Sequence, residues 1–257
     1  MPTPAPDRKP ITVSIVSHGQ LELVLPLLDQ LDQYSRAMID KVVLTINVPE
    51  PDRIAQATWR FPVERIVNSV RQGFGANHNQ AFARCDTRWF LVLNPDIRFD
   101  GDVLAALVDH AAADSGLLAP RILEPGKPAP EQHRAIITPL EIVSRKRSGY
   151  ARPAEPAWIP GLFMLFRSDA YAAIGGFDER FFMYGEDFDI CARLRLAGWK
   201  LQIAEALQAL HDARRASHRS KRHLYWHLTS LLKVWSSPAF WRYRRLDAVE
   251  RSKRRPR

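Results

Sequence analysis

The chain has few cysteines and no long apolar run. Its 257 residues include only Cys85 and Cys191, too few and too far apart for a disulfide framework or a cysteine-based zinc site. No apolar stretch approaches the roughly 20 residues that a membrane-spanning helix needs. The first ten residues are rich in proline and lack the apolar core of a secretory signal. These absences exclude a disulfide scaffold and an integral membrane protein, and they predict a cytoplasmic protein.

Net positive charge is lacking in most of the chain and is concentrated at its end. The formal net charge is +9, yet residues 213–257 carry +12 and the residues before them carry −3. A basic tail indicates a polyanionic partner, either anionic lipid or nucleic acid, although many such tails are only solvated. We divide the chain into a disordered N-terminus at 1–10, a folded domain at 11–218, and a basic, aromatic-rich helical extension at 219–257.

Apolar runs of strand length alternate with helical periodicity along the folded domain. Strands are expected at 12–17, 41–47, 63–67, 89–93, 117–123, 162–166 and 200–204, and helices at 21–31, 77–84, 103–113, 169–174 and 187–197. This alternation predicts an α/β fold with a mainly parallel central sheet flanked by helices, which binds ligands at the carboxyl ends of its strands. Residues 124–160 have little periodicity beyond a short helix at 140–147, and we interpret them as a flap on the acceptor side. Two further helices, at 220–236 and 239–250, form a C-terminal appendage.

The first candidate site is Asn94-Pro95-Asp96, which directly follows the apolar run at 89–93. A carboxylate at the end of a strand stands where α/β folds bind ligands, and its hard oxygens suit Mg²⁺ or Mn²⁺ on a diphosphate. The same three residues also favour an ordinary turn. Taken alone, the turn is the better explanation.

The second candidate site is the acid pair Glu186-Asp187, which lies among the aromatic residues of 177–189. Apolar rings beside paired carboxylates can raise the pKa of one of them, which suits a general base that takes a proton from an attacking hydroxyl. The alternative is that both acids only complement the dipole at a helix N-terminus.

Two weaker candidate sites are a pair of glycines ahead of a helix and a single histidine. The glycines of Gly73-Phe74-Gly75 stand ahead of a helix, where they can admit a phosphate or sugar closely, but a tight turn explains them equally well. His211 follows an apolar segment, and a lone histidine is more often packed or solvated than a ligand.

Together and in this order, these residues resemble family 2 glycosyltransferases with the GT-A fold, in particular the rhamnosyltransferase-like branch. The most specific stretch is 175–193, which is similar to the family's pattern G-G-F-D-E, F-F, E-D, D and R. Residues 71–79 resemble its N-x-G-F loop, and residues 94–96 resemble its DxD metal motif. The similarity extends over about residues 11–217.

The resemblance implies an inverting, metal-dependent hexosyltransferase of bacterial surface polysaccharide synthesis, with dTDP-L-rhamnose as the implied donor and a saccharide or lipid-linked molecule as the acceptor. Asp187 would be the catalytic base, and Glu186 would position the acceptor or the base. Asp96 and His211 would hold Mg²⁺ or Mn²⁺. The implied contacts with the nucleotide-sugar are Ser17, Asn47, Arg71, Gly73, Asn79, Asn94 and Asp96. The implied contacts with the acceptor are Trp158, Gly161 and Glu186.

The sequence departs from the family pattern at several positions, among them His18-Gly19 after the first expected strand. Asn94 replaces the first acid of the DxD motif, so the metal site has one negative charge fewer. Asn47 stands where the family usually has aspartate, and Arg71 where it usually has asparagine. These departures leave the nucleotide open.

The C-terminal extension has a helical face of leucines with aromatic and basic residues nearby. The face comprises Leu224, Leu228, Leu231, Leu232 and Trp235. Such a pattern predicts peripheral contact with the anionic inner face of the plasma membrane, and the alternative is packing onto the folded domain. Two other functions remain open at this point: a nucleic-acid-binding protein on a degenerate α/β scaffold, and a sugar-phosphate nucleotidyltransferase. The tail has no groove-reading motif, so we expect no specific nucleic acid partner.

Overall fold

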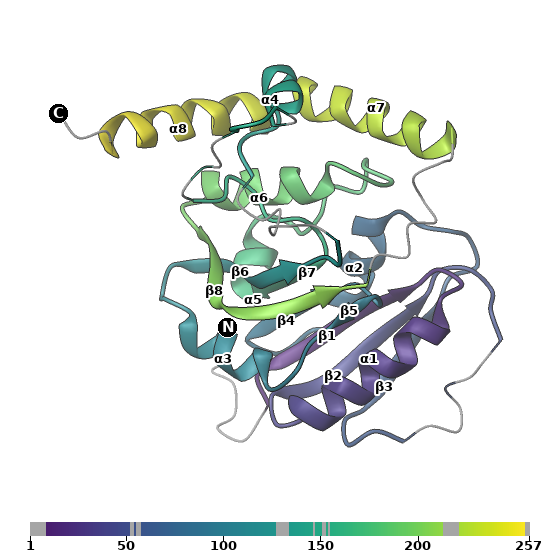
Figure 1. The fold of residues 1–257 in the computed structure, drawn as a ribbon. Helices are drawn as coiled ribbons and strands as arrows, with labels where there is room; N and C mark the ends of the chain where they lie inside the picture. The colour runs from purple at the N-terminus through teal and green to yellow at the C-terminus, as the bar shows by residue number, and fades with distance from the viewer. Residues whose placement is uncertain are drawn as a thin grey trace.

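The computed structural model describes residues 9–51, 54, 58–126, 134–145, 147–150, 153, 155–212 and 221–254, without the side chains of 221–223 and 254. Most of the N-terminal segment expected to be disordered, residues 1–8, lies outside the described residues. The described chain forms one large sheet with helices on both faces and two long helices at the C-terminal end (Figure 1).

The sheet has eight strands in the order β3-β2-β1-β4-β7-β6-β8-β5. Their bounds are β1 (Ile11–Ser17), β2 (Ile39–Ile46), β3 (Val63–Val67), β4 (Trp89–Leu93), β5 (Ile97–Arg98), β6 (Ser115–Leu123), β7 (Phe163–Arg167) and β8 (Lys200–His211). Strands β3, β2, β1 and β4 run parallel, as do β6 and β8, whereas β7 is antiparallel to both of its neighbours and β5 is antiparallel to β8. The expected mainly parallel sheet is confirmed.

Helices cover both faces of this sheet. Their bounds are α1 (Leu21–Tyr34), α2 (Phe74–Phe82), α3 (Val103–His110), α4 (Pro139–Ser144), α5 (Ser168–Ala173), α6 (Glu186–Leu196), α7 (Lys221–Ser236) and α8 (Pro238–Arg254). Alternate residues of β4 enter two different cores: Leu91 and Leu93 pack with α1 and α3, while Phe90 and Val92 pack with α5 and α6. Burial on both faces explains the unbroken apolar run of this strand.

The expected strand at 200–204 is too short, because β8 continues to His211. Its pairing with β6 shifts register between Pro120 and Arg121, and it then resumes as far as Leu123 opposite Leu210. Strand β5, which the sequence did not indicate, pairs Ile97 with His211. The extension of β8 therefore carries its last residue to the turn that follows β4.

The two expected C-terminal helices are confirmed as α7 and α8, which lie with α4 above α6 (Figure 1). Their inner side packs on the folded domain: Val234, Phe240 and Tyr243 are buried, and the Tyr243 hydroxyl donates to the carbonyl of Ala157 at 2.7 Å. None of the helices within the described ranges is long and apolar enough to cross a membrane. The division into domains at residue 218 stays a prediction.

Candidate active site

The first carboxylate site lies where β4 ends. The amide of Asn94 donates to the carbonyl of Leu162 at 3.0 Å, because the end of β4 lies beside the start of its antiparallel partner β7. Two residues on, Asp96 Oδ2 lies 3.1 Å from His211 Nε2. The amide of Asp212 also donates to the Asp96 carbonyl at 3.0 Å. The structure thus brings together the two residues predicted to hold the metal.

A second carboxylate contacts the same histidine. Glu124, which directly follows β6, places Oε1 3.3 Å from His211 Nδ1. Burial acts most strongly on the pKa of His211 and lowers it, but the hydrogen bonds and charges of Asp96 and Glu124 together outweigh burial and raise this pKa. Sequence reasoning missed Glu124, whose only signal was an acid at the carboxyl end of a strand.

The residues of this first site fit a divalent cation. Asp96 Oδ1 is buried and has no hydrogen-bond partner among the described residues, so one carboxylate oxygen remains available. Carboxylate oxygen and imidazole nitrogen both suit Mn²⁺, and the carboxylate suits Mg²⁺. The described ranges hold no ready-made group of three ligating side chains. Diphosphate and water oxygens would therefore have to complete the coordination, as they usually do for Mg²⁺.

The second carboxylate site is the start of α6. Tyr184 and Gly185 have φ values of 70° and 85°, and this left-handed turn starts the helix at Glu186. Glu186 is buried, and its Oε2 has no hydrogen-bond partner among the described residues. Burial, together with the charge of Asp187, raises the pKa of Glu186 to about 8. Glu186 therefore keeps its proton at neutral pH and is a poor base there.

Asp187 is better suited to act as a base. Its Oδ1 accepts a hydrogen bond from the Phe188 amide at 2.8 Å, and its Oδ2 accepts one from the Gly161 amide at 3.3 Å. Burial raises the pKa of Asp187, while these two hydrogen bonds and the charge of Arg134 act in the opposite direction. Gly161, predicted as an acceptor contact, thus lies against the predicted base.

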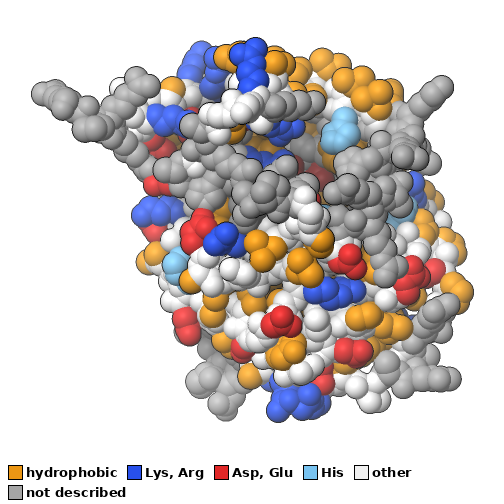
Figure 2. Space-filling model, in the orientation of Figure 1, with side chains coloured by type: hydrophobic (Ala, Val, Ile, Leu, Met, Phe, Trp, Pro, Cys, Tyr) orange, Lys and Arg blue, Asp and Glu red, His pale blue; other side chains and the backbone are white. Residues whose placement is uncertain are grey.

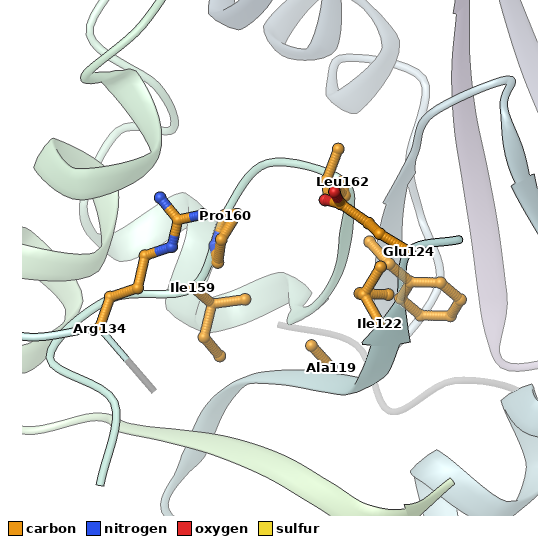
Figure 3. A pocket seen from close by; sticks show the side chains of 8 residues that line it. Ala119, Ile122, Glu124, Arg134, Ile159, Pro160 and Leu162 are labelled. Carbon is orange, nitrogen blue, oxygen red and sulfur yellow. The ribbon is translucent and has the colours of Figure 1, made fainter. Parts of the chain in front are cut away.

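A small hollow adjoins residues that contact both carboxylate sites, and Figure 3 shows the side chains that line it. Its lining is mostly apolar, with one acid and one base: Ala119, Ile122, Glu124, Arg134, Ile159, Pro160, Leu162 and Phe163. Glu124, which lines the hollow, also contacts His211. Pro160 and Leu162 line it as well, and they flank Gly161, whose amide donates to Asp187. The hollow thus adjoins neighbours of both sites.

Trp158, predicted as an acceptor contact, is buried beside this hollow. Its indole Nε1 donates to the carbonyl of Ala135 at 2.9 Å. The guanidinium carbon of Arg134 lies 4.8 Å from the centroid of the Trp158 ring. The tryptophan therefore supports Arg134, and its own contact with an acceptor stays a prediction.

Two of the predicted donor contacts hold loops at the carboxyl edge of the sheet. Asn47 Oδ1 accepts from Asn68 Nδ2 and from the Gln72 amide, both at 2.9 Å, and its Nδ2 donates to the Gln72 carbonyl at 3.0 Å. The buried Ser17 Oγ accepts from the Gln20 amide at 3.1 Å. Their place at the ends of β1 and β2 suits a nucleoside pocket, and their contact with the nucleotide stays a prediction.

Gly73 and Asn79 pack against the segment that leads to α6. A Cβ at Gly73 would lie 2.8 Å from the carbonyl oxygen of Phe182, so only glycine fits there. Asn79 Oδ1 accepts from the Phe177 amide at 2.9 Å, and its Nδ2 donates to the Phe177 carbonyl at 2.9 Å. Both residues hold the chain ahead of the predicted base, and their direct contact with a donor stays a prediction.

Helix α7 holds the same segment from the other side. Ser230 Oγ donates to the Met183 carbonyl at 2.9 Å, and the ring of His227 stacks on Tyr184 with centroids 3.5 Å apart. Arg71, a further predicted donor contact, has its guanidinium carbon 5.3 Å from the Trp226 ring centroid on this helix. The C-terminal extension is thus part of the scaffold of the second carboxylate site.

A largely parallel sheet with a carboxylate–histidine pair at a strand end and a buried carboxylate pair at a helix start defines the GT-A class of sugar transferases. Solved structures agree on the fold. GalNAc-T7 with UDP, GalNAc and Mn²⁺ is 15% identical, with a TM-score of 0.68 over 91% of this chain and 49% of that chain. The mannosyltransferase PcManGT of Pyrobaculum calidifontis, in complex with GDP-Man and Mn²⁺, is 17% identical, with a TM-score of 0.61 over 89% of this chain and 66% of that one.

Sequence comparison places the chain within this class. Residues 89–248 match the model of the glycosyl transferase family group 2, and the protein belongs to this family. It is 26% identical to the rhamnosyltransferase WbbL of Escherichia coli (strain K12), over 93% of this chain and 97% of WbbL. It is 28% identical to an N-acetylglucosaminyl-diphospho-decaprenol L-rhamnosyltransferase of Mycobacterium tuberculosis (strain ATCC 25618 / H37Rv), over 63% of each chain. The predicted family 2, rhamnosyltransferase-like resemblance is confirmed, and the nucleic-acid and nucleotidyltransferase alternatives are not favoured.

Proposed function

We propose that this glycosyltransferase transfers L-rhamnose from dTDP-L-rhamnose to a saccharide or lipid-linked acceptor in bacterial surface polysaccharide synthesis. The observation that carries the proposal is that Glu124, which contacts His211 of the Asp96–His211 pair, lines the same hollow as Pro160 and Leu162, which flank the Gly161 amide on Asp187. The rhamnosyltransferase names of two relatives support the sugar.

The proposed reaction is a single displacement with inversion. Asp187 takes the proton of the acceptor hydroxyl, whose oxygen bonds to the anomeric carbon of the donor as the bond from that carbon to the diphosphate oxygen breaks. The Gly161 and Phe188 amides hold the two oxygens of Asp187 during this step. Glu186, protonated at neutral pH, can donate a hydrogen bond to the acceptor. Asp96 and His211 would hold Mg²⁺ or Mn²⁺, which neutralises charge on the leaving diphosphate when bound.

A donor panel tests this function. We expect dTDP-L-rhamnose with Mn²⁺ to stabilise the protein against heat and to be hydrolysed slowly, and EDTA to abolish both effects; a ligand at 100 times its Kd adds about 2.7 kcal/mol to the free energy of unfolding. UDP-sugars and GDP-sugars serve as comparisons. Pyrophosphate release from a sugar phosphate and a nucleoside triphosphate would instead identify a nucleotidyltransferase. Stabilisation by oligonucleotides alone would identify a nucleic-acid-binding protein.

We also propose that the protein rests peripherally on the anionic, cytoplasmic face of the membrane through its C-terminal helices. Large apolar side chains are exposed on α4, α7 and α8: Leu140, Val143, Leu224, Tyr225, Leu228, Leu232 and Trp241. Exposed cations accompany them on α8: Arg242, Arg244, Arg245, Arg251 and Lys253. Figure 2 shows apolar and basic side chains together along the top of the molecule, over these helices. Lys and Arg near an anionic leaflet contribute about 1 kcal/mol each.

Vesicle co-sedimentation tests the membrane contact. At low salt, we expect binding to phosphatidylcholine vesicles that contain phosphatidylglycerol. Serine at Leu224, Leu228 and Leu232 together should weaken this binding by at least roughly tenfold, because three inserting side chains are lost. The matched control is serine at Val67 and Val70, which are 72% and 67% exposed; Val67 ends β3, the strand at one edge of the sheet. Absence of wild-type binding at low salt would refute the proposal.

A further inference from the structure

Glu124 has a role at the metal site that the sequence motifs do not assign. We propose that it is a positioning residue: its carboxylate holds the His211 ring so that Nε2 faces the cation position beside Asp96, and it replaces the negative charge that Asn94 lacks. The inference rests on the proposed function, because it concerns the metal of that same site. Glu124 contacts the histidine, directly follows β6, and has a side chain that is mostly shielded from solvent.

His211 lies between two carboxylates, one at each ring nitrogen. Glu124 Oε1 is 3.3 Å from Nδ1, and Asp96 Oδ2 is 3.1 Å from Nε2. Both ring nitrogens thus face carboxylate acceptors, and when a cation takes Nε2, the Nδ1–H would still donate to Glu124. Histidines that bind metals usually donate their other N–H to a carboxylate or a carbonyl in this way. Glu124 would therefore keep the ring in place when Nε2 binds the cation.

The sheet fixes all three side chains. Strand β8 lies between β6 and β5, with Leu210 opposite Leu123 of β6 and His211 opposite Ile97 of β5. Glu124 directly follows β6, and Asp96 directly precedes β5. Backbone pairing on both sides thus sets the position of His211 between its two acidic partners.

Glu124 also contributes negative charge to the proposed metal site. The DxD motif has two acids, whereas Asn94-Pro95-Asp96 has one, and Glu124 restores two carboxylates around the histidine. Their side chains are shielded, with 21% of Glu124, 22% of Asp96 and 14% of His211 exposed. Charges act strongly on one another in such surroundings. Glu124 also lines the hollow, where Figure 3 places it beside Leu162.

The test is Mn²⁺ affinity, measured by electron paramagnetic resonance with dTDP, UDP or GDP present in turn. Loss of a carboxylate that orients a ligating histidine typically weakens metal binding by roughly 10- to 100-fold, and we expect this loss for Glu124→Gln. The matched control is Glu205→Gln. Glu205 also bridges β8 to β6, through Arg121 at 3.6 Å, but away from the histidine. It should leave the affinity unchanged.

A double-mutant cycle separates positioning from general support of the fold. In a His211→Gln background, Glu124→Gln should weaken Mn²⁺ binding less than it does in the wild type, because the part of its effect that passes through the histidine is gone and only its charge remains. Three outcomes would overturn the role of Glu124 and leave the proposed function standing. They are wild-type Mn²⁺ affinity in Glu124→Gln, an equal loss of affinity in Glu205→Gln, and a drop in the Tm of Glu124→Gln without a change in its affinity. If the wild type bound no Mn²⁺ with any of these nucleotides, the metal of the proposed function would fall, and this inference with it.

Discussion

Asparagine in place of Asp187 is expected to lower kcat for sugar transfer by roughly 10²- to 10⁴-fold, the usual contribution of a positioned general base. Asparagine keeps the shape of the side chain and one oxygen for the Gly161 and Phe188 amides, but it cannot take a proton. The KM for the donor should change little, because Asp187 is proposed to act on the acceptor hydroxyl. The measurement is transfer of labelled sugar to acceptor at saturating donor.

The pH profile separates Asp187 from its neighbour. A base must be deprotonated, so kcat/KM rises with pH through the pKa of Asp187, which burial raises above its ordinary value of 3.8. Glu186 loses its proton near pH 8, and wild-type activity should fall there as its hydrogen-bond donation is lost. Glu186→Gln, which never ionises, should keep the rise and lose the fall. Transfer by Asp187→Asn at the wild-type rate would show that the base is a different residue.

The elements near the site were readable from the sequence because their signals are local. The apolar run 89–93 is buried on both faces, and the acids at 186 and 187 stand where a glycine with positive φ starts α6. Both patterns depend on neighbours in the chain, which periodicity and helix-start rules address directly. The GT-A fold could be predicted because several such signals follow in the family's order.

The pairing of distant residues could not be read in this way. His211 meets Asp96 only because β8 passes through a register shift and then pairs with the two-residue strand β5. The residues at that shift, 205–208, have no strand pattern, so the sequence alone predicted an end at 204. Glu124 was missed for the same reason, since its contact depends on the pairing of β6 with β8.

Two motif residues proved to have a structural task. Asn79 and Gly73 belong to a loop whose resemblance implied donor contacts, yet their observed contacts hold residues 177–182 in place. A Cβ at Gly176 would lie 2.5 Å from Asn79 Oδ1, so glycine and asparagine fit together across nearly a hundred residues. A motif read from sequence locates such positions, but only the packing distinguishes a residue that holds the site from one that touches the ligand.

Asparagine in place of Asp96 is expected to lower kcat/KM by roughly 10²- to 10³-fold, the range observed when one group that stabilises developing charge is lost. The Asp96 carboxylate has one oxygen on His211 and one buried oxygen without a partner among the described residues. Asparagine would retain the size of this side chain without its charge, so the dependence of the rate on Mn²⁺ should weaken as well. Asp100→Asn is the matched control, since Asp100 lies four residues along the chain and is exposed.

Hydrolysis of the donor by water separates the effect of Asp96→Asn from that of Asp187→Asn. Asp96 acts on the leaving diphosphate, so Asp96→Asn should slow both donor hydrolysis and transfer to the acceptor. Asp187 acts on the attacking hydroxyl, so Asp187→Asn should slow transfer far more than it changes Mn²⁺ dependence. An unchanged Mn²⁺ titration in Asp96→Asn would remove this residue from the metal site. Loss of metal dependence in Asp187→Asn would mean that the two carboxylate sites do not divide the work as proposed.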